Sequence, residues 1–268
     1  MTPKKVRYEI ILEYIFSEHH QAGMAEIEFD AAELKQAAET LELPCPKDLT
    51  DLVDSMKYPF DLPRTITSEQ PEGKEWVFQS NEPGHYRFEL RPAALYCPSP
   101  YLARKRLPDA TPGIVLRHLI SDEQKLLARV RHNRLLDIMT GIACHSLGTE
   151  SDVSASDGDR TEISEVYVGI GENQEQHVMP VWVKDRLSQT DREKIGRDLA
   201  ICKSRFPRQI CRPFLAQFMS RDLIALAELT QDKLGIWLWQ EKLYMLVRPK
   251  DMTADELESV CRHRLCNR

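Results

Sequence analysis

The stretch Thr161–Lys184, TEISEVYVGIGENQEQHVMPVWVK, decides how the second half of this chain folds. Its first arm, residues 162–170, is rich in β-branched and aromatic residues, and its second arm, residues 177–183, is mostly apolar. Both compositions are typical of β-strands. The polar run between them, residues 171–176, is typical of a turn, so the stretch predicts a β-hairpin.

Alternation of side chains along a strand assigns the charged residues of this hairpin to faces of the sheet. Glu162 and Ser164 share one face of the first arm, and Glu165 shares the other unless a bulge intervenes. On the second arm, Lys184 lies on the same side as Trp182. Carboxylates on one arm and a lysine at the end of the next are how metal-dependent nucleases assemble a Mg²⁺ site and a cation beside the scissile phosphate.

The hairpin resembles the PD-(D/E)xK nuclease superfamily, and within it a group of restriction-endonuclease-like bacterial proteins. The matching residues are Glu162–Gly169 (EISEVYVG) and Pro180–Lys184 (PVWVK). The similarity continues through residues 210–219 and back into residues 131–137, so it covers residues 115–250 as one region. The resemblance implies a mixed sheet flanked by helices, Mg²⁺ or Mn²⁺ as cofactor, and hydrolysis of DNA phosphodiesters in bacterial DNA defence.

Within this resemblance, Glu165, Glu162 and Lys184 are the catalytic candidates, and Glu165, Glu162 and Asp137 are the candidate metal ligands. Asp137 would contribute the carboxylate that the first helix often supplies to the metal site of such folds. A surface aspartate paired with Arg134 is an equally good reading of its position.

Two positions depart from the family pattern. Ser164 stands where the resemblance predicts a metal-binding Asp, and Trp182 stands where it predicts Asp, Glu or Gln. A hydroxyl binds Mg²⁺ poorly and an indole does not bind it at all. Two functions therefore stay open: a Mg²⁺-dependent DNA endonuclease with an unusual site, and a catalytically degenerate DNA- or protein-binding subunit of the same fold.

The distribution of charge divides the chain in two. Residues 1–97 hold 10 Lys and Arg against 18 Asp and Glu, a net charge of −8, and residues 98–268 hold 26 against 24, a net charge of +2. Three predicted helices and then two predicted strands in the first part follow the order of a winged helix-turn-helix domain. These segments are residues 3–18, 30–40, 47–57, 76–79 and 85–90. Such a domain binds DNA through its third helix, but the acidic charge favours a packing or protein-interaction module here, and both alternatives stay open.

The second part is predicted to be α/β, with the nuclease-like domain over residues 118–268. Five prolines between residues 91 and 117 argue against regular structure, so residues 98–117 are predicted to be the linker. The remaining predictions are helices over 121–140, 190–205 and from 253, a loop over 146–160, strands over 209–214 and 223–229, and a hairpin over 236–247.

Composition sets the class of the whole chain. The sequence is 42% hydrophobic and 29% charged, as in globular proteins, and no apolar run approaches the ~20 residues that a membrane span needs. Seven cysteines without short paired spacings suit a reducing compartment, and the N-terminus lacks the apolar core of a signal peptide. A cytoplasmic protein with DNA as partner and no membrane is expected, and a homodimer stays open.

Overall fold

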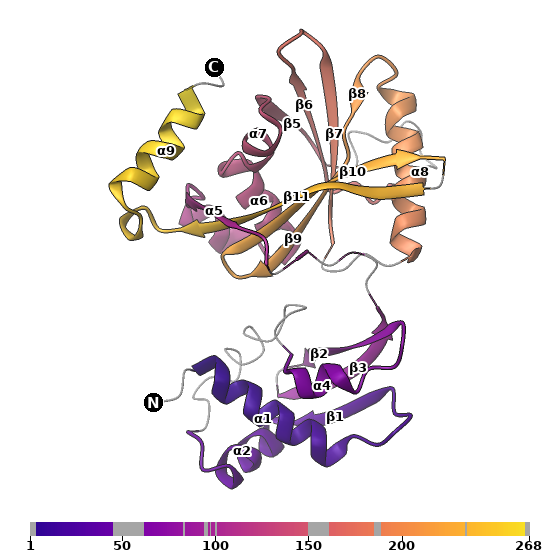
Figure 1. Cartoon of the computed structure of the whole chain (residues 1–268), viewed down its shortest axis with the longest axis vertical. Coiled ribbons are helices and arrows are strands. Elements are labelled where there is room, and N and C mark those ends of the chain that lie inside the picture. The colour runs from indigo at the N-terminus through magenta and orange to yellow at the C-terminus, as the bar shows by residue number, and fades with distance from the viewer. Residues whose placement is uncertain are drawn as a thin grey trace. The chain divides into compact units, whose positions relative to one another are not determined.

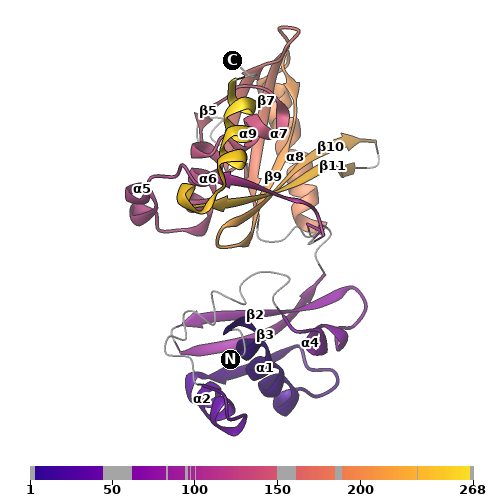
Figure 2. The same cartoon turned by 60° about the vertical axis from the view of Figure 1, so that its left-hand side comes forward.

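The computed structural model of the protein describes residues 4–44, 62–82, 84–93, 96, 98–99, 101–149, 161–184, 189–233 and 235–265 (Figures 1 and 2). The chain divides into two compact units, residues 1–97 and 98–268, and both mix helices with a sheet. The predicted helix over residues 47–57 and most of the predicted loop over 146–160 lie outside the described residues. No helix in the described part of the chain is long and apolar enough to cross a membrane.

The first unit packs helices against a three-stranded antiparallel sheet. Its elements are α1 (Lys4–His19), β1 (Glu26–Asp30), α2 (Ala31–Thr40), α4 (Arg64–Ser68), β2 (Lys74–Glu82) and β3 (His85–Pro92). The strands lie in the order β1-β3-β2. The two predicted strands are thus present as β2 and β3. The prediction missed β1, because five residues that alternate acidic and apolar side chains are a short signal.

The helix predicted over residues 30–40 is present as α2, and a capping box begins it. Asp30 Oδ1 accepts hydrogen bonds from the backbone N–H groups of Ala32, at 2.7 Å, and Glu33, at 3.0 Å. The Glu33 carboxylate in turn accepts from the Asp30 N–H at 3.2 Å. These bonds satisfy donors that the first turn of a helix leaves unpaired, and the backbone hydrogen bonds lower the pKa of Asp30.

The second unit is built on one mixed sheet. Its strands are β4 (Arg104–Pro108), β5 (Cys144–Gly148), β6 (Glu165–Ile170), β7 (Gln176–Val183), β8 (Ile210–Cys211), β9 (Phe214–Ser220), β10 (Leu223–Asp232) and β11 (Gly235–Val247). Its helices are α5 (Gly113–His118), α6 (Asp122–His132), α7 (Leu135–Thr140), α8 (Gln189–Arg205), the short 3₁₀ helix η2 (Pro249–Asp251) and α9 (Ala254–Leu265). The sheet order is β4-β11-β10-β9-β7-β6-β5, and β8 pairs with β7.

The predicted hairpin is present as β6 and β7, which lie between β5 and β9 in the sheet. β6 and β7 pair antiparallel without a bulge, with Glu165 opposite Val181. β9 pairs parallel with β7, and α8 connects the two strands. Helices α6 and α7 cover one face of the sheet and α8 covers the other (Figure 1). The hairpin is therefore sandwiched between helices, and most of its residues are buried on both faces.

Residues 98–117, predicted to be a linker, instead contain an edge strand and a short helix. β4 pairs parallel with the end of β11, and α5 begins after Pro112, which is its N-cap. The prolines do not interrupt these elements, because Pro108 is the last residue of β4 and a proline is tolerated where a helix begins. An edge strand also needs ladder hydrogen bonds on only one side.

Two further predictions about the second unit are wrong. The segment 236–247 is a single strand, β11, which pairs along its length with β10. The helix predicted over 121–140 is two helices, because Arg134 adopts a left-handed conformation with φ 52°. Asn133 stabilises this break, since its buried side chain accepts from the Ala110 N–H at 2.8 Å and donates to the Arg129 carbonyl at 2.9 Å.

Candidate functional site

The ends of β6 and β7 meet at one edge of the sheet and form an open pocket of ≈ 520 Å³. Glu162 and Ser164 lie just before β6, and Lys184 lies just after β7. The antiparallel pairing continues past the strand, because the Ser164 N–H donates to the Val181 carbonyl at 2.9 Å. Glu162, Ser164 and Lys184 all line the pocket, together with Glu123 from the first turn of α6.

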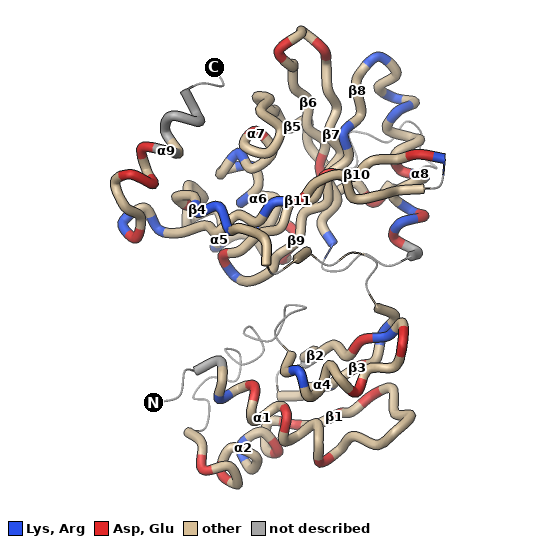
Figure 3. The backbone as a smooth tube through the Cα atoms, in the orientation of Figure 1, with Lys and Arg blue, Asp and Glu red and all other residues tan. Residues whose placement is uncertain are grey.

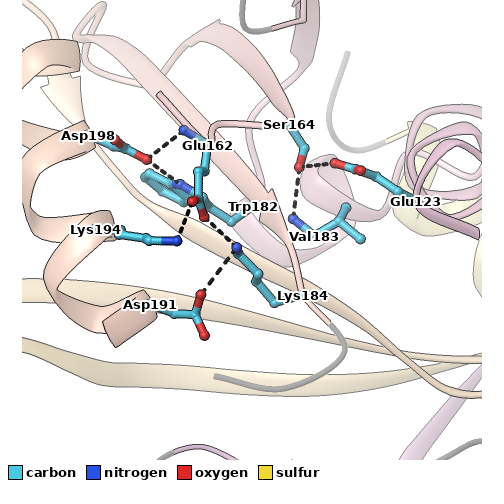
Figure 4. Close-up of polar contacts among 9 residues, drawn as sticks. All are labelled: Glu123, Glu162, Ser164, Trp182, Val183, Lys184, Asp191, Lys194 and Asp198. Carbon is cyan, nitrogen blue, oxygen red and sulfur yellow. Dashed lines mark hydrogen bonds and ion pairs between the residues drawn. The ribbon is translucent and has the colours of Figure 1, made fainter. Parts of the chain in front are cut away.

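Lys184 and Glu162, which the sequence places at the ends of the two arms, form an ion pair (Figure 4). Lys184 Nζ lies 2.5 Å from Glu162 Oε2 and 3.3 Å from Asp191 Oδ1. Lys194 of α8 binds the other Glu162 oxygen at 2.6 Å. One carboxylate thus accepts from two ammonium groups, and the sequence reasoning did not include Lys194 or Asp191, because their positions depend on how α8 packs.

Both charges of the ion pair are stabilised by their partners. Hydrogen bonds from Lys184 and Lys194 lower the pKa of Glu162, so its carboxylate stays ionised. Burial opposes the charge on Lys184, but hydrogen bonds and attraction from Glu162 and Asp191 outweigh burial and raise its pKa. The cluster is therefore an internally neutralised group of charges at neutral pH.

Ser164 and Trp182, the two departures from the family pattern, have structural partners of their own. The Ser164 hydroxyl donates to Glu123 Oε1 at 2.5 Å and accepts from the Val183 N–H at 3.1 Å. The Trp182 side chain is fully buried, and its indole N–H donates to Asp198 of α8 at 3.1 Å. The sequence predicts Glu123 only as part of the start of the helix over residues 121–140. Its place in the first turn of that helix is the signal that could have identified it as a residue of this pocket.

Glu165 contacts α6, whereas Glu162 contacts α8, so the two carboxylates are held by helices on different faces of the sheet. Its side chain is fully buried, and Oε1 accepts from Arg131 of α6 at 2.7 and 3.0 Å and from the Ser146 hydroxyl. Oε2 has no hydrogen-bond partner among the described residues. Burial opposes the charge on Arg131, but its bonds to Glu165 outweigh burial and raise the pKa of Arg131. Glu165 is thus the buried half of an ion pair with the half-exposed Arg131 of α6.

Asp137 is the fourth residue selected from the sequence, and it lies in α7. Its Oδ2 accepts from Arg134 Nε at 2.8 Å, which is the surface pairing that the sequence left open as an alternative. It does not line the pocket that Glu162 and Lys184 share. The structure therefore brings Glu162 and Lys184 together and leaves Glu165 and Asp137 in separate ion pairs.

The donors at this site do not fit Mg²⁺, which prefers several carboxylate or carbonyl oxygens around one point. Glu162 is already neutralised by two lysines, Glu165 by an arginine on the other face of the sheet, and a hydroxyl and an indole occupy the two remaining positions. Within the described ranges, no group of three His, Cys, Asp or Glu side chains is arranged to hold a metal ion.

Comparison of the chain with protein-family models, with curated protein sequences and with solved structures finds no match.

Proposed function

We propose that residues 98–268 form a PD-(D/E)xK-like, restriction-endonuclease-related domain that binds DNA without cleaving it. The observation that carries this proposal is the pairing of Glu162 with both Lys184, at 2.5 Å, and Lys194, at 2.6 Å. These two ammonium groups bind the carboxylate that a catalytic Mg²⁺ would need as a ligand. The endonuclease with a divalent metal is the competing proposal, and it requires this cluster to rearrange.

The order of elements supports a relationship to that fold. The resemblance implies a helix, a strand pair, a helix and a strand, and α6, β6–β7, α8 and β9 follow this order. Such a fold also requires a strand before the pair, and β5 fills that position. In the fold that the chain resembles, the cleavage site is expected where β6 begins and β7 ends. The ≈ 520 Å³ pocket opens at this place.

A DNA phosphate that binds at this site would compete with the Glu162 carboxylate for Lys184 and Lys194. Lys184 and Lys194 are compact cations of the kind that bind phosphate oxygens, and Glu162 is the anion that they now hold. A phosphate has to displace the Glu162 carboxylate to reach them. Removing the negative charge of Glu162 should therefore strengthen DNA binding, and removing the positive charge of Lys184 should weaken it.

The test uses the full-length chain with duplex DNA in the presence and absence of Mg²⁺ or Mn²⁺. We expect salt-dependent binding, no cleavage with either metal, tighter binding by Glu162→Gln and weaker binding by Lys184→Gln. Lys250→Gln, which removes an exposed lysine of η2 in the same unit, controls for a general loss of positive charge. Metal-dependent cleavage by the wild-type chain that Lys184→Gln abolishes would instead support the endonuclease.

We infer that the first unit is a winged-helix-like module that contacts a protein. Its order α1, β1, α2, α4, β2, β3 supports the assignment. The predicted helix over residues 47–57, which would enter a DNA groove, lies outside the described ranges. Three acids, Glu28, Asp30 and Glu33, line a pocket of ≈ 410 Å³ in this unit together with Arg87 and His85, and this excess of acids over arginine disfavours a phosphate backbone. Photo-crosslinking of the full-length chain to duplex DNA should label the second unit, and labels on β2 or β3 would assign DNA binding to the first.

A further inference from the structure

The first residues of β11, just after the turn from β10, include three consecutive large apolar side chains that are exposed. Trp237, Leu238 and Trp239 have exposed fractions of 43%, 44% and 69%. The other two tryptophans of the chain, Trp76 and Trp182, are buried, with exposed fractions of 3% and 0%. An indole as exposed as that of Trp239 contributes little to the core, so another role is needed to account for it.

A β-bulge places Trp239. Glu228 of β10 pairs with Gln240, and the next residue, Leu229, pairs with Leu238, so Trp239 is the extra residue of β11. A bulge of this kind re-aims a side chain out of the regular alternation of the strand. The Trp239 side chain at this bulge is 69% exposed.

Trp239 lines a pocket of ≈ 290 Å³ whose charged lining residues are Lys203, Arg212 and Glu228. Lys203 of α8 and Arg212, which follows β8, both line it. Arg212 is held by Glu228 at 2.6 and 2.9 Å, whereas the ammonium group of the exposed Lys203 contacts the neutral amide of Gln231 at 2.8 Å. The pocket therefore combines an aromatic face with a cation that faces solvent.

The surroundings of this pocket are basic. Residues 197–212, which form the second half of α8 and the turn into β8, contain five Lys and Arg and one Asp. That aspartate, Asp198, is buried and bonded to Trp182, so it adds little negative charge to the surface. Figure 3 shows the basic residues along this part of α8. The excess of positive charge favours a ligand that carries negative charge.

Trp237, the neighbouring tryptophan, already makes a contact between an aromatic ring and a cation. The Arg192 guanidinium lies over the Trp237 ring at 4.4 Å, and the Trp237 indole N–H donates to Asp232 at 2.9 Å. Arg192 and Asp232 thus hold Trp237 in place at the end of the hairpin. Trp239 has no ring or cation contact of this kind among the described residues, so its exposed face is available for stacking.

We propose that this surface, formed by Trp239, Trp237, Lys203 and Arg192, binds single-stranded nucleic acid. An unpaired base stacks on Trp239, and a neighbouring phosphate contacts Lys203. Aromatic rings beside cations are how proteins hold single strands with little sequence preference, because every base has a π-face. The proposal goes beyond the DNA-binding function of the Lys184 site, which lies at a different pocket and would contact a duplex backbone.

The test measures intrinsic tryptophan fluorescence of the full-length chain during titration with oligothymidylate or oligouridylate of about ten nucleotides, within the usual range for single-strand sites. Because Trp76 and Trp182 are buried, quenching by stacked bases reports on Trp237 and Trp239. We expect quenching and salt-dependent binding with at least one strand. A preference between the two strands shows whether the deoxythymidylate or the uridylate strand is the better ligand, and a matched duplex should quench less.

Variants separate stacking from charge. Trp239→Ala should weaken single-strand binding about ten- to a hundredfold, the range for loss of one stacked base, and Trp239→Phe should retain most of the affinity. Lys203→Gln should lower the slope of log affinity against log salt by about 0.7, as for loss of one contact to a single strand. Tyr101→Ala removes an exposed aromatic side chain of the same unit outside this surface and should change nothing.

Unchanged affinity and quenching in Trp239→Ala would overturn the proposal. It would also be overturned if Trp239→Ala changed only the oligomeric state in sedimentation experiments, because the surface would then join copies of the chain. Trp239→Ala is expected to leave duplex binding and its response to Glu162→Gln intact. Loss of single-strand binding alone is thus assigned to the Trp239 surface, and loss of duplex binding alone is assigned to the Lys184 site.

Discussion

Trp182 of β7 donates its indole N–H to Asp198 of α8, and the same Asp198 oxygen accepts the backbone N–H of Glu162 at 2.9 Å. The position where the resemblance expects a metal-binding side chain therefore ties the hairpin to the helix that covers it. A buried carboxylate with two such donors is satisfied without a metal ion. This relationship indicates that the departure at Trp182 is part of the packing of the unit.

Replacing Trp182 with Phe should lower the free energy of unfolding by about 1–3 kcal/mol, because it leaves buried Asp198 without one of its donors and opens a small void. Trp239→Phe, at an exposed position, should change stability by less than about 0.5 kcal/mol. Urea unfolding of both variants gives the comparison. Equal stability of the two variants would mean that the Trp182–Asp198 bond contributes nothing.

Glu165 and Arg131 should behave as a structural ion pair. Arg131→Met should destabilise the protein by about 3 kcal/mol, at the low end of the range for buried pairs because the arginine is half exposed. Arg131→Met combined with Glu165→Leu should recover much of this loss, since no buried charge is then left unpaired. Thermal unfolding measures both. If Mg²⁺ raises the melting temperature of the wild type but not of Glu165→Gln, then Glu165 binds metal and the pairing has been misread.

The sequence predicted those features that depend on local chemistry. The helices predicted from residues 30 and 121 begin there, with capping boxes at Asp30 and Glu33 and at Ser121 and Gln124, because cap hydrogen bonds connect residues three apart. The β6–β7 hairpin followed from its composition, and the meeting of Glu162 with Lys184 followed from antiparallel pairing. These features need no knowledge of distant contacts.

Features that depend on distant segments were missed. β5 is short, and its pairing with β6 across a long connection leaves little local signal. Lys194 contacts Glu162 only because α8 packs against the hairpin. Glu123 contacts Ser164 only because the first turn of α6 lies beside the residues before β6. The bulge at Trp239 depends on the register of β10 against β11, which the sequence of either strand alone does not specify.

Gly169 and Gly196 offer a matched pair of substitutions to alanine. A Cβ at Gly169 would lie 2.6 Å from Ile142 Cγ2 and 2.8 Å from the Ala143 carbonyl oxygen, so the residues that lead into β5 would have to move away from β6. Gly169→Ala should therefore destabilise the protein by about 1–3 kcal/mol. Gly196 lies within α8 with nothing within 4 Å of a Cβ, so Gly196→Ala should stabilise by about 0.5–1 kcal/mol. Destabilisation of both variants in urea would contradict the close approach of β5 as the cause.

His177 of β7 should make stability depend on pH. Its side chain is buried, with Nδ1 lacking a hydrogen-bond partner among the described residues. Burial lowers the pKa of His177, as does the positive charge of Arg212, and nearby Glu175 and Glu228 only partly oppose this. The folded protein therefore resists protonation at this position.

In the unfolded chain His177 takes up a proton as pH falls below its ordinary pKa of 6.5, whereas the folded chain keeps it neutral down to a lower pH. The free energy of unfolding should consequently decrease as pH falls from 6.5 to the folded pKa, by at most about 1.4 kcal/mol per pH unit from this group. His177→Gln should flatten that part of the stability profile, and His145→Gln, at an exposed position of β5, should leave it unchanged. Urea unfolding across this pH range gives the profiles. Identical slopes in the wild type and His177→Gln would show that His177 is protonated equally easily in both states, and that burial in β7 does not hold it neutral.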